Sequence, residues 1–277
     1  MIKEGNALTV SEKNKKDWND YAPKWAQLNH CEAVLRPVLE SPEKAFHQTV
    51  WGLIQKACPF LEGKRVCVPS SGDNLAVFAF AQLGAQVTSC DIAENQLANA
   101  QKVARREGLE GAIEFICTDT MTLAGVPDNS FDLVYTSNGV HVWLNDLPAM
   151  YRNICRVLRP GGWNILYDIH PFLRPFDDDL KLIKPYDATG PFESEQTVNF
   201  HWRMQDILNA LLDAGLRLRQ IEELFDEKDY ERPFWVSPAK ALSGVRLSRE
   251  EVDKGYDWRE NPLMGLPQWL CALSRKE

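Results

Sequence analysis

The sequence predicts an α/β fold built on a doubly wound, mostly parallel sheet. Short apolar runs alternate with helical patterns from Lys64 onward, which is typical of such a sheet. A turn of small residues follows the first apolar run, at the position where open α/β sheets bind their ligands. The chain has 277 residues and a formal net charge of −8, so we expect one soluble domain with additions.

The elements of the sheet can be taken in order. We expect strands at Arg65–Val68, Gln86–Cys90, Ile113–Cys117, Phe131–Ser137 and Trp163–Asp168. We expect helices between them at Leu75–Leu83, Glu94–Glu107 and Leu147–Leu158. The first helix is apolar on nearly every side, which predicts tight packing against the sheet. The sequence Pro160-Gly161-Gly162 predicts a sharp turn into the fifth strand.

The remaining residues extend this core, 64–168, within a single domain, 1–277. Residues 1–60 predict a helical cap, with one helix over Glu12–Asn29 and an interruption at Pro37 and Pro42. Residues 170–200 are rich in proline and too long for a simple connection; they are either a lid or a surface excursion without function. Residues 201–277 contain a helix at Met204–Ala214, a strand at Leu216–Leu224, an insertion at 226–261 and a final apolar run at Gln268–Leu273.

Composition excludes several classes of function. The acidic chain has no cluster of Lys and Arg that would bind nucleic acid. Its seven cysteines form no C-x-x-C pair, so neither a disulfide framework nor a metal site is indicated. No apolar stretch approaches the ~20 residues of a membrane span and the first residues lack the apolar core of a signal peptide, so we expect a cytoplasmic protein. A monomer and a homodimer are both compatible with the sequence.

The turn after the first strand reads Pro69-Ser70-Ser71-Gly72-Asp73-Asn74 and retains one glycine of a dinucleotide fingerprint. Ser is nearly as small as Gly and Asn tolerates positive φ, so the turn can still be tight. Asp73 would place a carboxylate at the helix start, which disfavours a pyrophosphate and suits a cationic or zwitterionic ligand. Asp91, at the end of the second strand, could accept two hydrogen bonds from a ribose diol; alternatively it caps the following helix.

Four further segments resemble the class I S-adenosylmethionine (SAM)-dependent methyltransferases. They are Ser89-Cys90-Asp91-Ile92, Phe115-Ile116-Cys117-Thr118-Asp119, Phe131-Asp132-Leu133-Val134-Tyr135 with the Thr136-Ser137-Asn138-Gly139 loop, and Arg156-Val157-Leu158-Arg159-Pro160-Gly161-Gly162. The resemblance implies a seven-stranded sheet in which Gln268–Leu273 inserts antiparallel beside the sixth strand. It also implies SAM as cofactor and S-adenosylhomocysteine (SAH) as product. The turn departs from the family pattern at Val68, Ser70 and Asn74.

The same resemblance implies where the cofactor binds. Asp91 would hold the ribose hydroxyls, Ile92 would pack on adenine, and Asp119 with Thr120 would accept from the adenine amino group. The other residues implied are Pro69, Ser70, Ser71, Gly72 and Asn74 in the turn, Asn138 near the methionine moiety, and Tyr21 and Trp25 as a cover from the first helix. Core packing would equally explain that aromatic stripe.

Methyl transfer from a sulfonium needs little acid–base help, because the leaving group is neutral and alignment supplies much of the catalysis. If the acceptor arrives protonated, His141 after the fourth strand or His170 after the fifth would act as base; each is otherwise a loop histidine with a structural contact. Aromatic residues of the second insertion could line an acceptor pocket: Tyr230, Phe234, Trp235, Tyr256 and Trp258.

The sequence therefore predicts methyl transfer from SAM to a small-molecule acceptor. One alternative is a methyltransferase-like protein that binds SAM or SAH without catalysis. The other is a nicotinamide-dependent oxidoreductase, which the polar turn disfavours.

Overall fold

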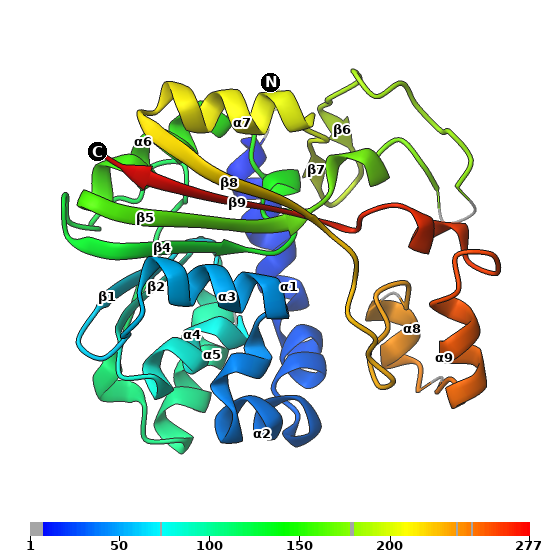
Figure 1. Cartoon of the computed structure of the whole chain (residues 1–277), viewed down its shortest axis with the longest axis horizontal. Helices are drawn as coiled ribbons and strands as arrows, with labels where there is room; N and C mark the ends of the chain where they lie inside the picture. Colours follow the sequence, from blue (N-terminus) through cyan, green and yellow to red (C-terminus); the bar gives the residue numbers. More distant parts are fainter. Residues whose placement is uncertain (1–7, 73, 178–179, 237, 245) are drawn as a thin grey trace, which may run out of the picture.

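A seven-stranded sheet forms the centre of the molecule (Figure 1), and its strands follow the order β3-β2-β1-β4-β5-β9-β8. The computed structural model describes residues 8–72, 74–177, 180–236, 238–244 and 246–277. The strands are β1 (Arg65–Val68), β2 (Gln86–Asp91), β3 (Ile113–Cys117), β4 (Phe131–Ser137), β5 (Leu158–Ile169), β8 (Leu216–Leu224) and β9 (Trp269–Lys276). Strands β1 to β5 pair in parallel, and β9 is antiparallel to both β5 and β8. The predicted sheet and its antiparallel final strand are confirmed.

Helices cover both faces of this sheet (Figure 1). On one face lie α3 (Gln48–Ala57), α4 (Leu75–Gln82) and α5 (Glu94–Arg106), and on the other α6 (Leu147–Val157) and α7 (Met204–Asp213). Alternate residues of a strand supply the two layers: Val66 and Val68 face the first, whereas Cys67 faces the second. All six residues from Ala76 to Ala81 are buried, which explains why α4 is apolar on every side.

The Pro-Gly-Gly sequence forms a bulge inside β5, so the expected turn before the fifth strand is wrong. Phe131 of β4 pairs with Leu158 and Leu133 pairs with Trp163, which places several extra residues on β5. Gly161 has a φ of 79°, and a Cβ on Gly162 would lie 2.9 Å from the carbonyl oxygens of Phe131 and of Arg159. Both positions therefore require glycine for steric reasons.

The N-terminal cap consists of α1 (Val10–Asn29), α2 (Glu32–Glu40), the 3₁₀ turn η1 (Pro42–Ala45) and α3. Helix α1 begins two residues before the expected Glu12, because Thr9 and Glu12 form a reciprocal capping box. Pro37 lies inside α2, where the sequence predicted an interruption.

Two long segments lie beyond the carboxyl ends of β4, β5 and β8 (Figure 1). The described part of residues 170–200 contains the 3₁₀ turn η4 (Pro171–Leu173) and the short hairpin β6 (Phe192–Glu193) and β7 (Val198–Asn199). Residues 226–261 contain α8 (Pro238–Leu242) and α9 (Arg249–Gly255), and η5 (Pro262–Gly265) leads into β9. None of the described helices has the length and apolarity needed to cross a membrane.

Candidate functional site

The turn after β1 replaces glycines with hydroxyl groups that bind neighbouring strands. Ser70 adopts a φ of 47° and Gly72 a φ of 49°, so a serine occupies the left-handed region that usually favours glycine. The hydroxyls of Ser70 and Thr120 hydrogen-bond at 2.6 Å. The Ser71 backbone amide donates to the Cys90 carbonyl at 2.8 Å, and its buried hydroxyl lies 2.7 Å from that of Ser89. The turn is therefore tight and fixed at both ends; Pro69 before it is buried.

Asn74 joins this turn to the end of β4. Its Oδ1 accepts from Ala76 N at 2.9 Å, which makes it the N-cap of α4. Its Nδ2 donates to the backbone carbonyl and to the hydroxyl of Ser137, at 3.0 and 2.9 Å. With a φ of −57°, Asn74 does not use its tolerance for positive φ. Asp73 lies outside the described residues.

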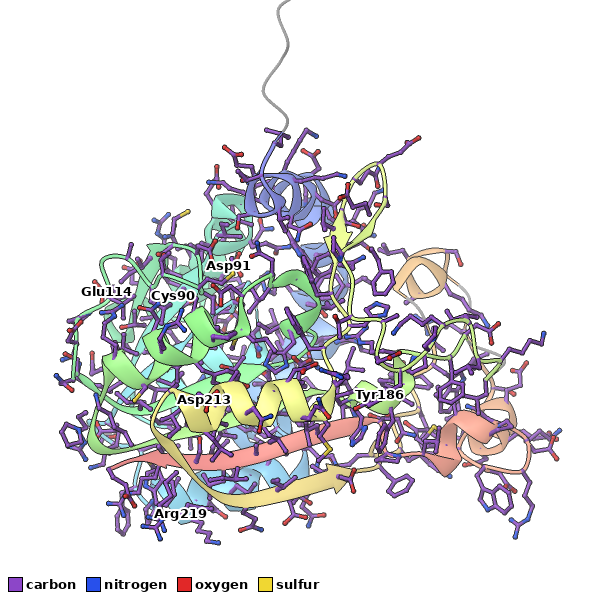
Figure 2. The ribbon with its side chains drawn as sticks, turned by 90° about the horizontal axis from the view of Figure 1, so that it is seen from above. Cys90, Asp91, Glu114, Tyr186, Asp213 and Arg219 are labelled. Atoms are coloured by element: carbon purple, nitrogen blue, oxygen red, sulfur yellow. The ribbon has the colours of Figure 1, made fainter. Side chains whose placement is uncertain are left out.

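Asp91 ends β2 (Figure 2) and contacts the turn after β1 directly. Its Oδ2 accepts from Gly72 N and its Oδ1 from Ala93 N, both at 2.7 Å. Burial raises the pKa of the Asp91 carboxyl to about 6, against the hydrogen bonds from Ala93, Gly72 and Ile92. Ala93 is the N-cap of α5 and no side-chain hydrogen bond caps this helix, so Asp91 is not its N-cap and that alternative is wrong. Because each carboxylate oxygen has two lone pairs, the contacts with Gly72 and Ala93 leave acceptor capacity for a ribose diol.

Asp119 lies in the loop after β3 and connects it to the first helix. Its Oδ1 accepts from Met121 N at 2.8 Å, and its Oδ2 accepts from the Ser11 hydroxyl of α1 at 2.9 Å. The backbone amide of Thr118 donates to the Asp91 carbonyl at 2.9 Å. The predicted adenosine residues Asp91, Asp119 and Thr120 are therefore brought to neighbouring strand ends.

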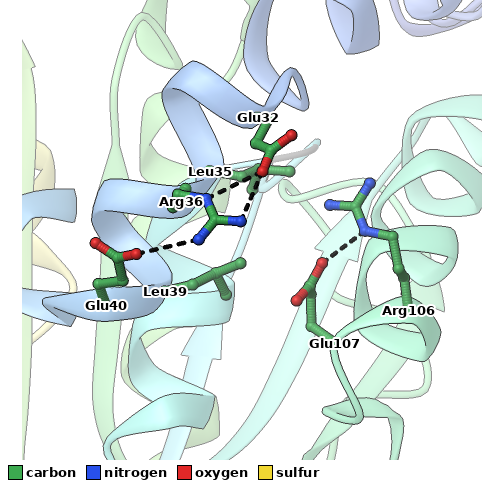
Figure 3. A pocket seen from close by; sticks show the side chains of 7 residues that line it. All are labelled: Glu32, Leu35, Arg36, Leu39, Glu40, Arg106 and Glu107. Atoms are coloured by element: carbon green, nitrogen blue, oxygen red, sulfur yellow. Dashed lines mark hydrogen bonds and ion pairs between the residues drawn. The ribbon is translucent and has the colours of Figure 1, made fainter.

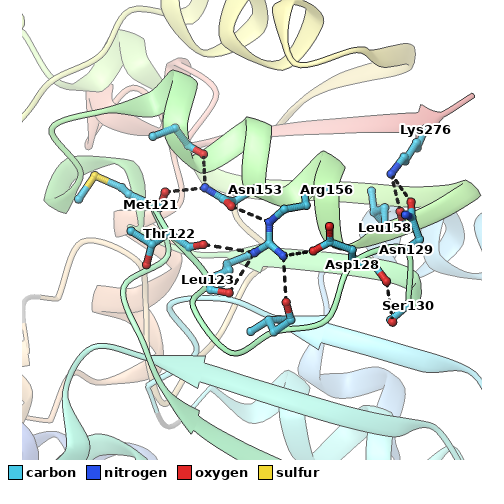
Figure 4. Close-up of polar contacts among 12 residues, drawn as sticks. Met121, Thr122, Leu123, Asp128, Asn129, Ser130, Asn153, Arg156, Leu158 and Lys276 are labelled. Atoms are coloured by element: carbon cyan, nitrogen blue, oxygen red, sulfur yellow. Dashed lines mark hydrogen bonds and ion pairs between the residues drawn. The ribbon is translucent and has the colours of Figure 1, made fainter.

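Arg156 on α6 holds the rest of this loop (Figure 4). Its Nη2 donates to the carbonyls of Thr122 and Leu123 at 3.2 and 3.0 Å. Its Nη1 donates to the carbonyl of Val126 at 3.0 Å and pairs with the Asp128 carboxylate. One guanidinium thus binds three backbone carbonyls and one carboxylate of the loop that begins at Asp119. The sequence motif Arg156–Gly162 did not reveal this role.

Helix α1 lies across the carboxyl ends of β2, β3 and β4. Beyond the Ser11 contact after β3, Asn19 Oδ1 accepts from Asn95 N of α5 at 2.9 Å. Asn14 is buried, and its Nδ2 donates to the Trp143 carbonyl at 3.2 Å and to the Val198 carbonyl at 2.9 Å. Sequence analysis missed these short polar residues, because they are not part of the apolar repeat that identified α1.

The aromatic stripe of α1 reaches the same edge. The Trp18 ring lies edge-on to Trp143, with 5.2 Å between centroids, and Trp143 belongs to the 3₁₀ turn η3 (His141–Trp143) after β4. Tyr21 and Trp25 pack on Trp18 with centroids 6.4 and 5.6 Å away. The stripe therefore packs within the protein, as one of the two interpretations expected. Contact of Tyr21 or Trp25 with a cofactor stays a prediction.

His141 is enclosed within the protein, with 5% of its surface exposed. Its Nδ1 lies 3.0 Å from Asp168 Oδ2 and its Nε2 lies 3.0 Å from the Tyr151 hydroxyl. Burial acts to raise the pKa of Asp168, but His141 and its hydrogen bonds lower it to about 2. The backbone amides of Gly139, Val140 and His141 all donate to this carboxylate. His141 and Asp168 therefore shape the loop that presents the exposed Asn138.

His170 caps the turn after β5. Its Nδ1 accepts from Phe172 N at 3.2 Å, so Nε2 carries the proton and donates to Glu223 Oε1 at 2.9 Å. Burial lowers the pKa of His170, while Glu223 acts to raise it. Both nitrogens of each candidate histidine thus have protein neighbours, as the structural alternative required, and a role as base stays a prediction.

The aromatic residues of the second insertion do not form one group. Trp235 packs edge-on against Tyr256 at 4.6 Å, whereas Phe234 packs on Trp269 of β9 at 5.1 Å between centroids. Tyr230 and Trp258 are 39% and 57% exposed. An acceptor pocket lined by all five stays a prediction.

A surface hollow of about 410 Å³ lies between α2 and the end of α5 (Figure 3). Its charged groups are paired with one another: Arg36 with Glu32 at 2.7 Å, and Arg106 with Glu107 at 2.6 Å. Because α5 starts beside Asp91 and runs back, its last residues lie at the opposite edge of the sheet from the candidate site.

The chain matches known methyltransferases in sequence. Residues 69–166 match a family described as a methyltransferase domain. The methyltransferase GfsG of Streptomyces halstedii is 32% identical over 202 residues, which cover 72% of this chain and 68% of that protein. Sterol 24-C-methyltransferase ERG6A of Gibberella zeae is 28% identical over 152 residues, 55% of this chain. The match spans only 39% of the length of ERG6A.

The fold is shared with solved structures. An S-adenosylmethionine-dependent methyltransferase from Mesorhizobium loti superposes with a TM-score of 0.59 and 22% identity, over 82% of this chain and 97% of that one. Together with the strand order and the match to GfsG, this places the chain in a family. The protein belongs to the class I S-adenosylmethionine-dependent methyltransferases.

Proposed function

We propose that the protein transfers a methyl group from SAM to a small-molecule acceptor. The observation that carries this proposal is the contact between the β1 turn and Asp91, in which Gly72 N donates to the carboxylate at 2.7 Å. This contact brings a tight, amide-lined turn against an acceptor for ribose hydroxyls, which is the arrangement that a nucleoside bound at the ends of parallel strands needs.

The residues present suit the cofactor. Asp91 would accept from the two ribose hydroxyls, Ile92 would pack on adenine, and Asp119 with Thr120 would bind the amino group of the base. The amides of the Pro69–Asn74 turn and the exposed Asn138 would hold the amino acid moiety. When bound, SAM supplies an activated methyl group on a positively charged sulfur.

The protein's share of the reaction is positioning. Asp168 collects three backbone amides of the loop after β4 and so fixes where Asn138 lies relative to the turn after β1. Helix α1 covers the strand ends and would exclude water from the reacting atoms. Alignment of donor and acceptor supplies much of the rate, and a base is needed only where the acceptor carries a proton.

The acceptor is proposed to be a small molecule. The related ERG6A is named for methylation of a sterol carbon, which supports a small organic acceptor but does not identify one for this chain. The net charge of −8 supports the absence of a nucleic-acid partner.

Isothermal titration of the purified protein with SAM, SAH and NAD in parallel tests the proposal. Micromolar binding of SAM and SAH without binding of NAD is expected, followed by transfer of labelled methyl to a member of an acceptor panel. Binding of both sulfur nucleosides without transfer to any acceptor would favour a non-catalytic SAM-binding protein. Binding of NAD alone would favour an oxidoreductase, and binding of none would overturn the cofactor site.

A further inference from the structure

Three nitrogen-bearing side chains interact electrostatically in the segment that follows β5. They are Arg174, just after η4, Lys184, and His201, just after β7. The Lys184 Nζ lies 5.3 Å from the centroid of the Phe192 ring, and that ring lies 4.6 Å from the imidazole of His201. Lys184 also donates to the Ala188 carbonyl at 2.8 Å, which directs its ammonium into the fold of the segment.

Among the residues that the structure describes, the half-buried Arg174 guanidinium has no bound partner. In the described part of the chain, no carboxylate or carbonyl oxygen lies within hydrogen-bond or ion-pair distance of its side chain, whereas Arg203 pairs with Asp206 at 2.8 Å. Asp168 is the carboxylate that attracts Arg174 from a distance. That carboxylate is already occupied by His141 and backbone amides, so it does not bind Arg174 directly.

The positive charges of Arg174 and Lys184 act on each other and on His201. Burial lowers the pKa of Arg174, and burial together with the Arg174 charge lowers that of Lys184, whereas the carboxylates of Asp168 and Asp187 act in the opposite direction on Arg174 and Lys184 respectively. Burial lowers the pKa of His201 to about 4, and the positive charges of Arg174 and Lys184 add to this effect. His201 is therefore neutral at pH 7, and its buried Nδ1 has no hydrogen-bond partner among the described residues. A buried polar atom without a partner is costly, and so is a half-buried guanidinium without a bound carboxylate.

We propose that Arg174, Lys184 and His201 bind an anionic group of the methyl acceptor, a carboxylate or a phosphate. An oxyanion supplies what the cluster lacks: two parallel acceptors for the guanidinium fork and a charge for the ammonium. The inference rests on the proposed function for its assignment to the acceptor, and the existence of the anion site does not depend on it.

The position of the cluster suits an acceptor site. Arg174 follows β5 by five residues, and the segment lies beyond the carboxyl ends of β4 and β5, where ligands of open α/β sheets bind (Figure 1). Tyr186, labelled in Figure 2, anchors the middle of the segment, because its hydroxyl accepts from Met204 N at 2.9 Å. This anchoring holds Lys184 close to Phe192 and His201 without any ligand.

The test uses the full chain saturated with SAH, at constant ionic strength. Isothermal titrations with inorganic phosphate, pyrophosphate, acetate and benzoate form two arms, one for phosphates and one for carboxylates. We expect one arm to bind and the Arg174→Met variant to bind that anion at least tenfold more weakly, with Arg174→Lys in between. Arg105→Met is the matched control, because Arg105 lies on α5 and pairs with Glu110 at 3.5 Å.

The arm that binds identifies the anion, and SAH affinity of the wild type, measured beforehand, separates the two proposals. If the wild type does not bind SAH but binds an anion in its absence, the proposed function is removed and the anion site remains. Absence of binding in both arms, or equal affinity of the wild type and Arg174→Met, would overturn the site. If Arg174→Met does not fold by circular dichroism, Lys184→Met decides, since the same tenfold loss is expected there and equal affinity would refute the proposal.

Discussion

Replacement of Asp91 by alanine tests the cofactor site most directly. In the structure the carboxylate accepts two backbone hydrogen bonds of 2.7 Å, from Gly72 and Ala93, and has lone pairs left for a ribose diol. The substitution would remove the acceptors for the diol and release the turn that Gly72 anchors. Hydrogen bonds to charged groups contribute about 1.5–3 kcal/mol each, of which water recovers part when the ribose is left unpaired. We therefore expect Asp91→Ala to weaken SAM binding by about 1–3 kcal/mol, roughly 5- to 150-fold in Kd.

The pKa of Asp91 adds a dependence on pH with a defined sign. The free carboxyl, with a pKa of about 6, is largely protonated at pH 5 and ionised at pH 7. Ribose hydroxyls donate to the ionised form and so lower the pKa of the complex. SAM affinity should therefore rise with pH from 5 to 7, by up to about tenfold per unit below the free pKa, and level off above 7.

Titration calorimetry with SAM at pH 5, 6, 7 and 8 measures both effects on the wild type and on Asp91→Ala. The variant should show a flat profile over this range. Asp213→Ala is the matched control, because Asp213 is exposed on α7 (Figure 2). An unchanged Kd in Asp91→Ala at pH 7 would remove Asp91 from the ribose site, and a flat profile in the wild type would refute the pH argument.

Two further substitutions test how the surrounding structure is held. Arg156→Gln should lower the free energy of unfolding by about 2–4 kcal/mol, because three carbonyls of residues 122–126 lose a charged donor, and it should also weaken SAM binding. Urea unfolding measures the stability and calorimetry measures the SAM affinity. Arg152→Gln, an exposed position on α6, is the control, and equal values in both variants would contradict the prediction. Gly162→Ala should cost about 1–3 kcal/mol because its Cβ would meet carbonyl oxygens at 2.9 Å. Gly111→Ala, whose Cβ meets nothing within 4 Å, should change stability little, and a stable Gly162→Ala would refute the steric account.

Most of the sheet could be predicted because buried parallel strands are continuous apolar runs with helices between them. The four expected strands from Arg65–Val68 to Phe131–Ser137 agree with the structure to within one residue. The start of β5 could not be predicted, because Pro-Gly-Gly is locally typical of a turn. Only the pairing of β5 with Phe131 and Leu133 shows that it forms a bulge. Helix α2 was missed at Pro37, because proline is a strong local break signal that helical packing here overrides.

Sequence reasoning named candidate site residues where they form a local pattern, and it missed contacts between residues that are distant in sequence. The end of β2 and its Asp91 follow from an apolar run that stops at a carboxylate. The neighbours of His141 and His170, namely Asp168, Tyr151 and Glu223, come from other strands and helices, so the orientation of the imidazoles could not be read from spacing. The Arg174 cluster depends likewise on the path of an irregular segment.

The polar contacts that hold α1 in place have a consequence for the binding and release of ligands. Ser11 and Asn14 tie the helix to the loops after β3 and β4, and Asn14 also binds Val198 of the hairpin. Asn19 ties it to the start of α5 through three hydrogen bonds with Glu94 and Asn95. If the cofactor binds under this helix as proposed, its release requires several of these bonds to open together. Transient undocking of the first helix would then set its residence time, and the exchange of SAH for SAM would become a step that can limit turnover.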